Sequence, residues 1–472
     1  MTISTPVQTA TRTSAPPAAA RRITITDPRD GTEIGSVPVA DDEEVRAALA
    51  AARTALPAWR ATPPAARGLA LRDAAHALAA REHELAELNT RETGRPYDEA
   101  LAGVRAGIDT FLQYSELGPV HRGRSLRGAP TAADYTRAEP RGVAVLVTPW
   151  NDPVAVAAGL LGAALVSGNT VVHKPSERCP HLGALLGQII APAFPAHVVQ
   201  TVLGDAQTGQ ALVGSPGVDV VAHVGSTASG RRIAEAVART GAHLVRENGG
   251  NDALVVDEDV DHVWAAEQAA LGAFANTGQI CTSVERVFVH RAIAEAFLEA
   301  MVAQARDRNE RRLLGPLVDE RMRTAVHDQV AASLRAGARA LVGGEVPEGP
   351  GSYYPATVLV DCTPDMPVMT EETFGPVAPV VVVDSFEEGL ALAAADRYGL
   401  AATVLTGSLA HAHAAVDTLP VGTVKVNAVF GGAPGGSAQP RGDSGSGFGY
   451  GPELLDEMTT VKVVHLEAAR TA

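Results

Sequence analysis

Residues 142–172 read GVAVLVTPWNDPVAVAAGLLGAALVSGNTVV, and this stretch contains the repeating unit of the fold. Residues 142–147 are apolar and rich in valine, which predicts a buried strand. The apolar run at 154–166 is long enough for a buried helix, and 170–172 predicts a second strand. Because parallel strands need a crossover connection, this order predicts a parallel β-α-β unit.

The same alternation continues in both directions along the chain. Helical and strand-like runs alternate over 142–224, and a second alternating region follows over 253–383. Upstream, Asp41 and Glu44 have the spacing of a capping box, and a further helix is expected over 63–88. The sequence therefore predicts an α/β protein with an open parallel sheet and helices on both faces.

The composition of the 472 residues narrows the class of protein further. With 46% hydrophobic and 20% charged residues, the chain can bury sizeable cores, which excludes a disordered or collagen-like chain. A formal charge of −15 opposes binding to nucleic acids and anionic membranes, and the run at 154–166 is shorter than the ~20 residues that span a bilayer. Three cysteines, Cys179, Cys281 and Cys362, are too few for a disulfide framework, so a cytoplasmic protein without a nucleic-acid or membrane partner is expected.

Three segments stand outside the α/β alternation. Residues 121–140 are rich in glycine and arginine and predict a projecting hairpin. Residues 459–466 read TTVKVVHL and predict an isolated strand after the last helix. Residues 1–22 are rich in Ser, Thr, Ala and Pro and are expected to form a disordered tail.

Two motifs carry groups suited to covalent chemistry. In FANTGQICTS, residues 274–283, Cys281 follows a Gly-Gln turn among polar residues. A thiolate surrounded by backbone N–H groups is a good nucleophile, and the alternative is a buried structural cysteine. In RENGGND, residues 246–252, Glu247 precedes a glycine pair that lets the backbone turn beside a ligand. The alternative for Glu247 is a solvated surface acid.

Two further motifs follow strands of the predicted sheet. TPWNDP, residues 148–153, places Asn151 at the carboxyl end of a strand, where ligands gather in open α/β sheets. The alternative for this motif is a polar turn with asparagine as a helix cap. GSTASG, residues 225–230, opens a helix whose free N–H groups can bind phosphate. It lacks the G-x-G-x-x-G pattern, so by itself it is a weak signal.

Together the four motifs resemble the aldehyde dehydrogenase superfamily, and the resemblance extends over nearly the whole chain. Further motifs occur in the family's order: ETGRP at 92–96, KPSE at 174–177, GPL at 315–317, EETFGP at 371–376, VKVN at 424–427 and SGSG at 444–447. So many motifs in register are not expected by chance. The resemblance implies an enzyme that oxidises a small-molecule aldehyde to a carboxylic acid with NAD, and NADP is also compatible.

The resemblance also implies how the chain is divided. A Rossmann-like NAD-binding domain takes residues 23–120 and 141–245, and an α/β catalytic domain takes residues 246–440. The hairpin at 121–140 and the C-terminal segment 441–472 form a β oligomerisation arm. Since exposed strand edges need a partner, a homodimer or homotetramer is expected.

For the chemistry, the resemblance assigns roles to individual residues. Cys281 would attack the aldehyde carbon, and the Asn151 amide and the Cys281 N–H would hold the oxyanion of the thiohemiacetal. Glu247 would activate the water that hydrolyses the thioester. Glu177 favours NAD over NADP, because a carboxylate accepts a hydrogen bond from the ribose 2′-OH and repels a 2′-phosphate. The cofactor-binding residues implied by the resemblance are Lys174, Ser176, Glu177, Gly209, Gly225, Ser226, Glu372 and Phe374.

Three other functions remain open at this point. A CoA-acylating enzyme would pass the acyl group to CoA, although the presence of Glu247 favours hydrolysis. A thiol hydrolase would pair Cys281 with a histidine, and none of the motifs contains one. A non-catalytic relative would need neither Cys281 nor Glu247. No metal is expected, since the spacing of His173, Cys179 and His181 matches no zinc pattern.

Two departures from the family pattern bear on the substrate. Asp152 follows the oxyanion asparagine and Asn248 follows the catalytic glutamate, where apolar residues are usual. If both face the reacting carbon, they favour a small polar aldehyde, because a buried unpaired polar group costs about 1–3 kcal/mol. An ionised Asp152 would disfavour an anionic semialdehyde unless Lys425 or an arginine compensates. The alternative is that both side chains turn away from the pocket. The Gly/Ser-rich segment 431–449 also departs from the family pattern.

Overall fold

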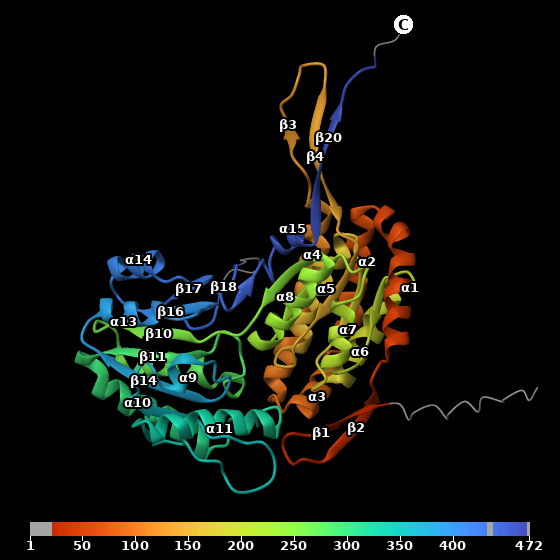
Figure 1. Ribbon diagram of the computed structural model, residues 1–472. Coiled ribbons are helices and arrows are strands. Elements are labelled where there is room, and N and C mark those ends of the chain that lie inside the picture. Colours follow the sequence, from red (N-terminus) through yellow and green to blue (C-terminus); the bar gives the residue numbers. More distant parts are fainter. Residues whose placement is uncertain (1–20, 432–437, 470–472) are drawn as a thin grey trace, which may run out of the picture.

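The computed structural model describes residues 21–431 and 438–469, which form two α/β lobes and a projecting β arm (Figure 1). The first lobe contains a six-stranded sheet and the second a seven-stranded sheet. The α/β class predicted from the sequence is confirmed. Most of the tail expected at 1–22, and residues 432–437 of the Gly/Ser-rich segment, lie outside the described residues.

The sheet of the first lobe is parallel except for its edge strand β19. In order across the sheet, its strands are β19 (Gly445–Ser446), β9 (His243–Glu247), β8 (Val220–Val224), β5 (Val143–Val147), β6 (Thr170–Lys174) and β7 (Val199–Thr201). The helices of this lobe are α1 (Asp42–Ala61), α2 (Pro64–Ala79), α3 (Glu82–Thr93), α4 (Tyr97–Val120), α5 (Pro153–Val166), α6 (Pro180–Ile190), α7 (Ala206–Val213) and α8 (Thr227–Thr240).

Helices cover both faces of this sheet, as the residues of β5 show. Ala144 and Leu146 belong to a core with residues of α2, α4, α5 and α6. Val143 and Val145 face the other way, into a core with residues of α1, α7 and α8. Because successive side chains of a strand point to opposite faces, an all-apolar strand is what a sheet covered on both sides requires. No helix within the described residues is long and apolar enough to cross a membrane.

The second lobe repeats this arrangement. Its strands, in order across the sheet, are β12 (Arg339–Val342), β13 (Thr357–Val360), β14 (Val377–Val383), β11 (Val284–His290), β10 (Asp252–Val256), β16 (Ala401–Leu405) and β17 (Thr423–Val426). Its helices are α9 (His262–Phe274), α10 (Arg291–Glu310), α11 (Glu320–Arg335), α12 (Pro367–Thr370), α13 (Phe386–Ala394) and α14 (Leu409–Thr418). Alternate residues of β10 again enter two separate cores, which places helices on both faces.

The arm consists of the two segments that looked unpaired in the sequence. β20 (Thr459–Leu466) pairs antiparallel with β4 (Ala133–Pro140) along its whole length, and β3 (Ser125–Leu126) pairs on the other side of β4. Figure 1 shows this sheet extending away from both lobes. The predicted hairpin and the predicted C-terminal strand are therefore confirmed, and they form one sheet. The remaining elements are β1 (Arg22–Thr26), β2 (Glu33–Pro38), β15 (Tyr398–Gly399), β18 (Arg441–Gly442), α15 (Leu454–Glu457) and the short 3-10 helix η1 (Ala191–Ala193).

Two boundaries differ from the sequence-based expectation. The helix expected over 63–88 is divided into α2 and α3 at residues 80–81, and both helices pack on α4 and α6. Strand β9 continues through Glu247, which pairs with Val224 of β8, so the first lobe extends past residue 245. No glycine or proline marks the break between α2 and α3, whereas the Gly249-Gly250 pair follows shortly after the end of β9.

Candidate active site

Cys281 lies in a loop whose conformation is held by side-chain hydrogen bonds. The 3-10 helix η2 (Ala275–Gly278) precedes it, and there Asn276 has φ 47° and Thr277 has φ 58°, left-handed values that are rare for residues with side chains. The Asn276 amide donates to the backbone oxygen of Gln279 at 3.1 Å, and the Gln279 amide donates to that of Asn276 at 3.0 Å. These bonds fix the loop and with it the position of Cys281.

Asn151 joins this loop to the first lobe. It follows β5, and its side-chain amide donates to the backbone oxygen of Gln279 at 3.1 Å. Its backbone oxygen accepts from the Asn276 amide at 3.3 Å and from the Arg95 guanidinium at 3.2 Å. An amide nitrogen carries two hydrogens, so one hydrogen of Asn151 remains for a further acceptor.

Glu247 is the last residue of β9, and its carboxyl group lies against Gly449. The Gly449 N–H donates to this carboxyl group, and a Cβ added to Gly449 would lie 2.1 Å from Glu247 Cδ. Any side chain at position 449 would therefore displace the carboxyl group. Burial raises the pKa of Glu247 to about 7, which places its titration near neutral pH.

The thiol of Cys281 is surrounded by acidic side chains. Burial, and next the charges of Glu247, Asp252 and Glu372, raise the pKa of Cys281 to about 12, while Lys425 acts in the opposite direction. The thiol is therefore protonated at neutral pH in the free protein. Its use as a nucleophile requires a base that accepts the proton.

Two cavities meet at Cys281. The first, which we call the large cavity, has a volume of about 1070 Å³ and is lined by residues of α4, β17 and the C-terminal loop, with Glu247 and Lys425 in its wall. The second, which we call the junction cavity, has a volume of about 170 Å³ and is lined by Asn151 and Glu372 among others. One cysteine thus faces both spaces.

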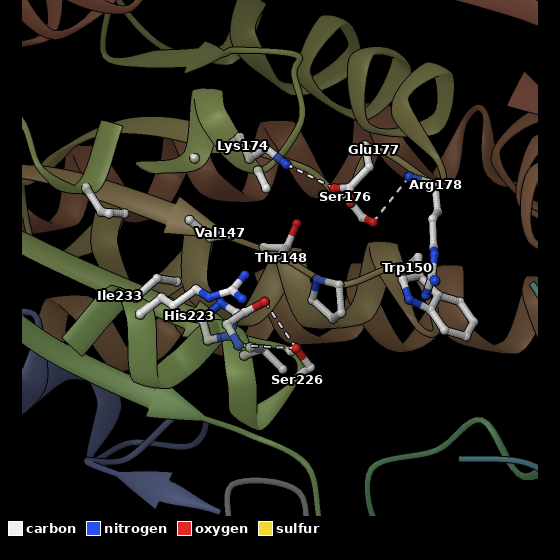
Figure 2. A pocket seen from close by; sticks show the side chains of 18 of the residues that line it. Val147, Thr148, Trp150, Lys174, Ser176, Glu177, Arg178, His223, Ser226 and Ile233 are labelled. Atoms are coloured by element: carbon white, nitrogen blue, oxygen red, sulfur yellow. Dashed lines mark hydrogen bonds and ion pairs between the residues drawn. The ribbon is translucent and has the colours of Figure 1, made fainter. Parts of the chain in front are cut away.

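A third cavity of about 320 Å³, which we call the nucleotide cavity, lies at the carboxyl ends of β5, β6 and β8. In Figure 2, Lys174 and Ser226 lie on opposite sides of it, with Thr148 between them. It shares Gly225, Ser226 and other residues with the junction cavity, so the two spaces adjoin. Six residues predicted to bind the cofactor line it: Lys174, Ser176, Glu177, Gly209, Gly225 and Ser226.

The side chains of the nucleotide cavity fit a dinucleotide. Helix α8 begins at Thr227 beside the cavity, so the free N–H groups and the positive dipole of its first turn favour a phosphate. Both ring nitrogens of His223, which lines the cavity, are buried without a hydrogen-bond partner. Lys174 Nζ lies 3.3 Å from Glu177 Oε2, which offers a donor and an acceptor to ribose hydroxyls. The first turn of α8 therefore suits the phosphates of NAD, and Lys174 and Glu177 suit its ribose hydroxyls.

Glu372 and Phe374, the other two predicted cofactor residues, line the junction cavity. The Gly250 N–H donates to Glu372 Oε1 at 3.0 Å. Their loop is held by a residue that the sequence analysis missed: the buried Glu285 accepts from the backbone N–H of Thr373 at 2.6 Å and of Phe374 at 2.9 Å. The only sequence signal for Glu285 was an acid inside an apolar strand directly after the cysteine motif.

Neither Asp152 nor Asn248 lines the large cavity, but Asn248 lines the junction cavity together with Cys281. The Asp152 carboxylate lies 2.9 Å from the Arg95 guanidinium. The Asn248 amide donates to the backbone oxygen of Asp443 at 2.8 Å. Adjacency to a site residue does not predict direction, because neighbours in an extended chain point to opposite sides. Asp152 therefore lines neither cavity, whereas Asn248 lies beside the space that Cys281 faces, with its side-chain oxygen buried and without a hydrogen-bond partner.

The three residues weighed as metal ligands do not share a bonding partner: His173, Cys179 and His181. His173 Nε2 is 2.8 Å from the Thr148 hydroxyl, and His181 Nδ1 is 2.8 Å from Glu92 Oε1. Burial raises the pKa of Cys179 well above its ordinary value. Across residues 21–431 and 438–469, no group of three or more His, Cys, Asp and Glu side chains is arranged to hold a metal ion.

A nucleotide cavity that leads to a cysteine, with a second cavity on the other side, defines a nucleotide-dependent oxidoreductase of two α/β lobes. Residues 16–464 match the model of the aldehyde dehydrogenase family. Betaine aldehyde dehydrogenase of Rhizobium leguminosarum is 37% identical, over 93% of this chain and 92% of the relative. Alpha-ketoglutarate semialdehyde dehydrogenase of Haloferax volcanii is 36% identical, over 85% and 86%.

The crystal structure of an NAD-dependent aldehyde dehydrogenase from Sinorhizobium meliloti superposes with a TM-score of 0.92 at 32% identity, covering 96% of this chain and 92% of that one. The chain belongs to the aldehyde dehydrogenase family. It oxidises an aldehyde to a carboxylic acid, and NAD is its cofactor.

The contact between Gly449 and Glu247 yields a first prediction. In Gly449→Ala, the added methyl group displaces the Glu247 carboxyl, and a misplacement of about 1 Å can reduce the rate about 100-fold. We expect steady-state kcat with NAD to fall at least tenfold, while the melting temperature falls by only a few degrees. Gly35→Ala is the control, because its Cβ would approach only the His181 ring, at 3.2 Å. Full activity in Gly449→Ala would contradict the placement of Glu247.

Proposed function

We propose that Cys281 is the nucleophile of the oxidation and that Asn151 and Glu247 assist it. The observation that supports this most is that Cys281 faces both the junction cavity and the large cavity. The sulfur attacks the aldehyde carbon, and the thiol proton leaves to solvent through the large cavity. The oxyanion of the resulting thiohemiacetal accepts hydrogen bonds from the remaining Asn151 amide hydrogen and the Cys281 N–H.

When bound, NAD supplies the hydride acceptor of this oxidation. Lys174, Glu177 and the first turn of α8 would hold it in the nucleotide cavity, and Glu372 and Phe374 would contact it in the junction cavity.

The acyl group is then a thioester on Cys281, and its release is the role of Glu247. Glu247 takes a proton from water as the water oxygen attacks the thioester carbon, and the C–S bond breaks as the sulfur takes that proton from Glu247, which gives the acid and the thiol. Overall, one aldehyde, one NAD and one water become one carboxylic acid, one NADH and one proton.

The proposal also divides the chain by task. Residues 23–120 and 141–247 hold the cofactor, and residues 248–440 carry the nucleophile; the first range ends two residues later than expected, because β9 includes Glu247. Cys179, Cys281 and Cys362 are free thiols, which fits a reducing compartment such as the cytoplasm.

The arm is the proposed contact between copies of this chain in a homodimer or homotetramer. Val461 and Val463 of β20 are 68% and 67% exposed, and they lie on the same face because they are two residues apart. Exposed valines on a strand that extends away from the core favour coverage by another chain.

This predicts the oligomeric state. The mass in solution should be two or four times 48.7 kDa by light scattering, and a Val461→Asp, Val463→Asp double variant should shift it towards a single chain. Thr460→Asp is the matched control, because Thr460 is exposed on the opposite face of the same strand. A wild-type protein of one chain would refute the arm's role.

The role of Glu247 predicts a difference between the first and later turnovers. Cys281→Ala should form no NADH. Because a general base contributes about 10²–10⁴-fold, Glu247→Gln should reduce steady turnover by roughly that factor and slow the first turnover less, so that a burst of NADH appears in stopped flow. The wild type should release acid in equal amounts with and without CoA, which separates it from a CoA-acylating enzyme. Unchanged steady turnover in Glu247→Gln would exclude the assignment.

The pH profile supplies the control for this experiment. Glu247 acts as a base only when ionised, and its pKa is about 7. Steady-state kcat should therefore rise from pH 6 to pH 8, and this rise should be absent in Glu247→Gln.

Glu177 predicts a preference for NAD over NADP. Although burial opposes its ionisation, the charge of Lys174 holds the pKa of Glu177 below its ordinary value, so a carboxylate stands at the ribose position and repels a 2′-phosphate. We expect a higher kcat/KM with NAD, and Glu177→Gln should narrow the difference by about tenfold. Three arginines line the same cavity, and their positive charges reduce the preference for NAD over NADP because they attract a 2′-phosphate: Arg178, Arg232 and Arg321. A higher kcat/KM with NADP in the wild type would refute it.

A further inference from the structure

The wall of the large cavity carries a single basic side chain among its described lining residues, that of Lys425 in β17. Its ammonium group is held in place: Nζ donates to the backbone oxygen of Val429 at 2.7 Å and lies 5.6 Å from the centre of the Phe430 ring. Lys425 and Cys281 line the same cavity and act on each other electrostatically. A fixed positive charge thus stands near the proposed nucleophile.

This ammonium group has no carboxylate partner. Among the described residues, no acidic oxygen lies within 4.0 Å of Lys425 Nζ, and residues 432–437 contain no charged side chain. Burial lowers the pKa of Lys425, and the facing Asp252 counters it only in part, since burial raises the pKa of Asp252 to about 8. A half-buried ammonium with free N–H groups and no carboxylate oxygen within 4.0 Å among the described residues is a ready site for an anion.

The acids of the large cavity lie elsewhere. Asp109 and Glu116, both on α4, are exposed, so water and salt screen their charges. Glu247 is assigned to the chemistry. The Asp152 carboxylate, the group expected to repel an anionic substrate, is paired with Arg95 and does not line the cavity. Asp252 and Glu372 also act on Cys281, but neither lines the large cavity, and burial raises the pKa of both. Lys425 therefore supplies the positive charge that a small substrate meets in this cavity.

We propose that Lys425 determines specificity by binding a carboxylate carried by the substrate, and that the substrate class is a semialdehyde, with an aldehyde and a carboxylate in one small molecule. The inference rests on the proposed function, because the aldehyde end must reach Cys281. The carboxylate then accepts from the free N–H groups of Lys425, as in other charge-assisted hydrogen bonds. The product of the oxidation is a dicarboxylate. An aldehyde with a quaternary ammonium group is repelled by the same residue.

The test compares aldehydes that differ in charge. We would measure kcat/KM with NAD for a series of unbranched semialdehydes from 3-oxopropanoate to 6-oxohexanoate, for butanal and for betaine aldehyde. The best semialdehyde should exceed butanal by about tenfold or more, and betaine aldehyde should be the poorest. In Lys425→Met this selectivity ratio should fall by about tenfold through the KM of the semialdehyde, and Lys425→Arg should restore most of it. Lys462→Met, a lysine of the arm, is the control and should keep the ratio.

Each other outcome overturns the inference in a distinguishable way. If Lys425→Met lowers kcat/KM equally for all three classes, Lys425 acts on the thiol and not on the substrate. If betaine aldehyde is preferred, the exposed acids of α4 and not Lys425 determine which substrate charge is accepted. If butanal is oxidised and no semialdehyde exceeds it, the substrate class is wrong while the proposed function stands. If no aldehyde yields NADH, the proposed function itself fails, and the inference fails with it.

Discussion

The hydrogen bond from the Asn151 amide to the backbone oxygen of Gln279 is the contact on which the rest of the site depends. It links the carboxyl end of β5 in the first lobe to the cysteine loop of the second. The loop itself has two consecutive residues, Asn276 and Thr277, in left-handed conformations, which persist only where surrounding bonds impose them. Through this contact the cavities of the first lobe lie next to Cys281 of the second.

The electrostatics around the thiol follow from burial. Glu247, Asp252 and Glu372 all lie where desolvation disfavours their charged forms, and together with burial they keep Cys281 protonated in the free protein. The acids hold their positions because the backbone comes close to them: an added Cβ would lie 2.1 Å from Glu247 Cδ at Gly449 and 2.0 Å from Glu372 Oε1 at Gly249. The glycines of the site therefore make room for carboxyl groups as well as for a ligand.

The two polar departures from the family pattern, Asp152 and Asn248, both form bonds with other parts of the protein. Asp152 forms an ion pair with Arg95, whose guanidinium also donates to the backbone oxygen of Asn151, so the acid helps to hold Asn151 in place. Asn248 is bonded to the C-terminal loop at Asp443. Asn248 lines the junction cavity but not the large cavity, where Lys425 is the basic group among the described lining residues.

The sequence by itself determined the α/β class, the order of the elements and the arm strand at 459–466, because apolar periodicity and turn residues are local properties that folding preserves. Its motifs also indicated Cys281, Glu247 and Asn151, which the structure brings to one place. Only the tertiary structure decided where α2 ends, that β9 reaches Glu247, which way Asp152 and Asn248 point, and that Gly449 contacts a residue of the first lobe. Such properties depend on contacts between segments far apart in the chain, and no local pattern records which side chain will meet which.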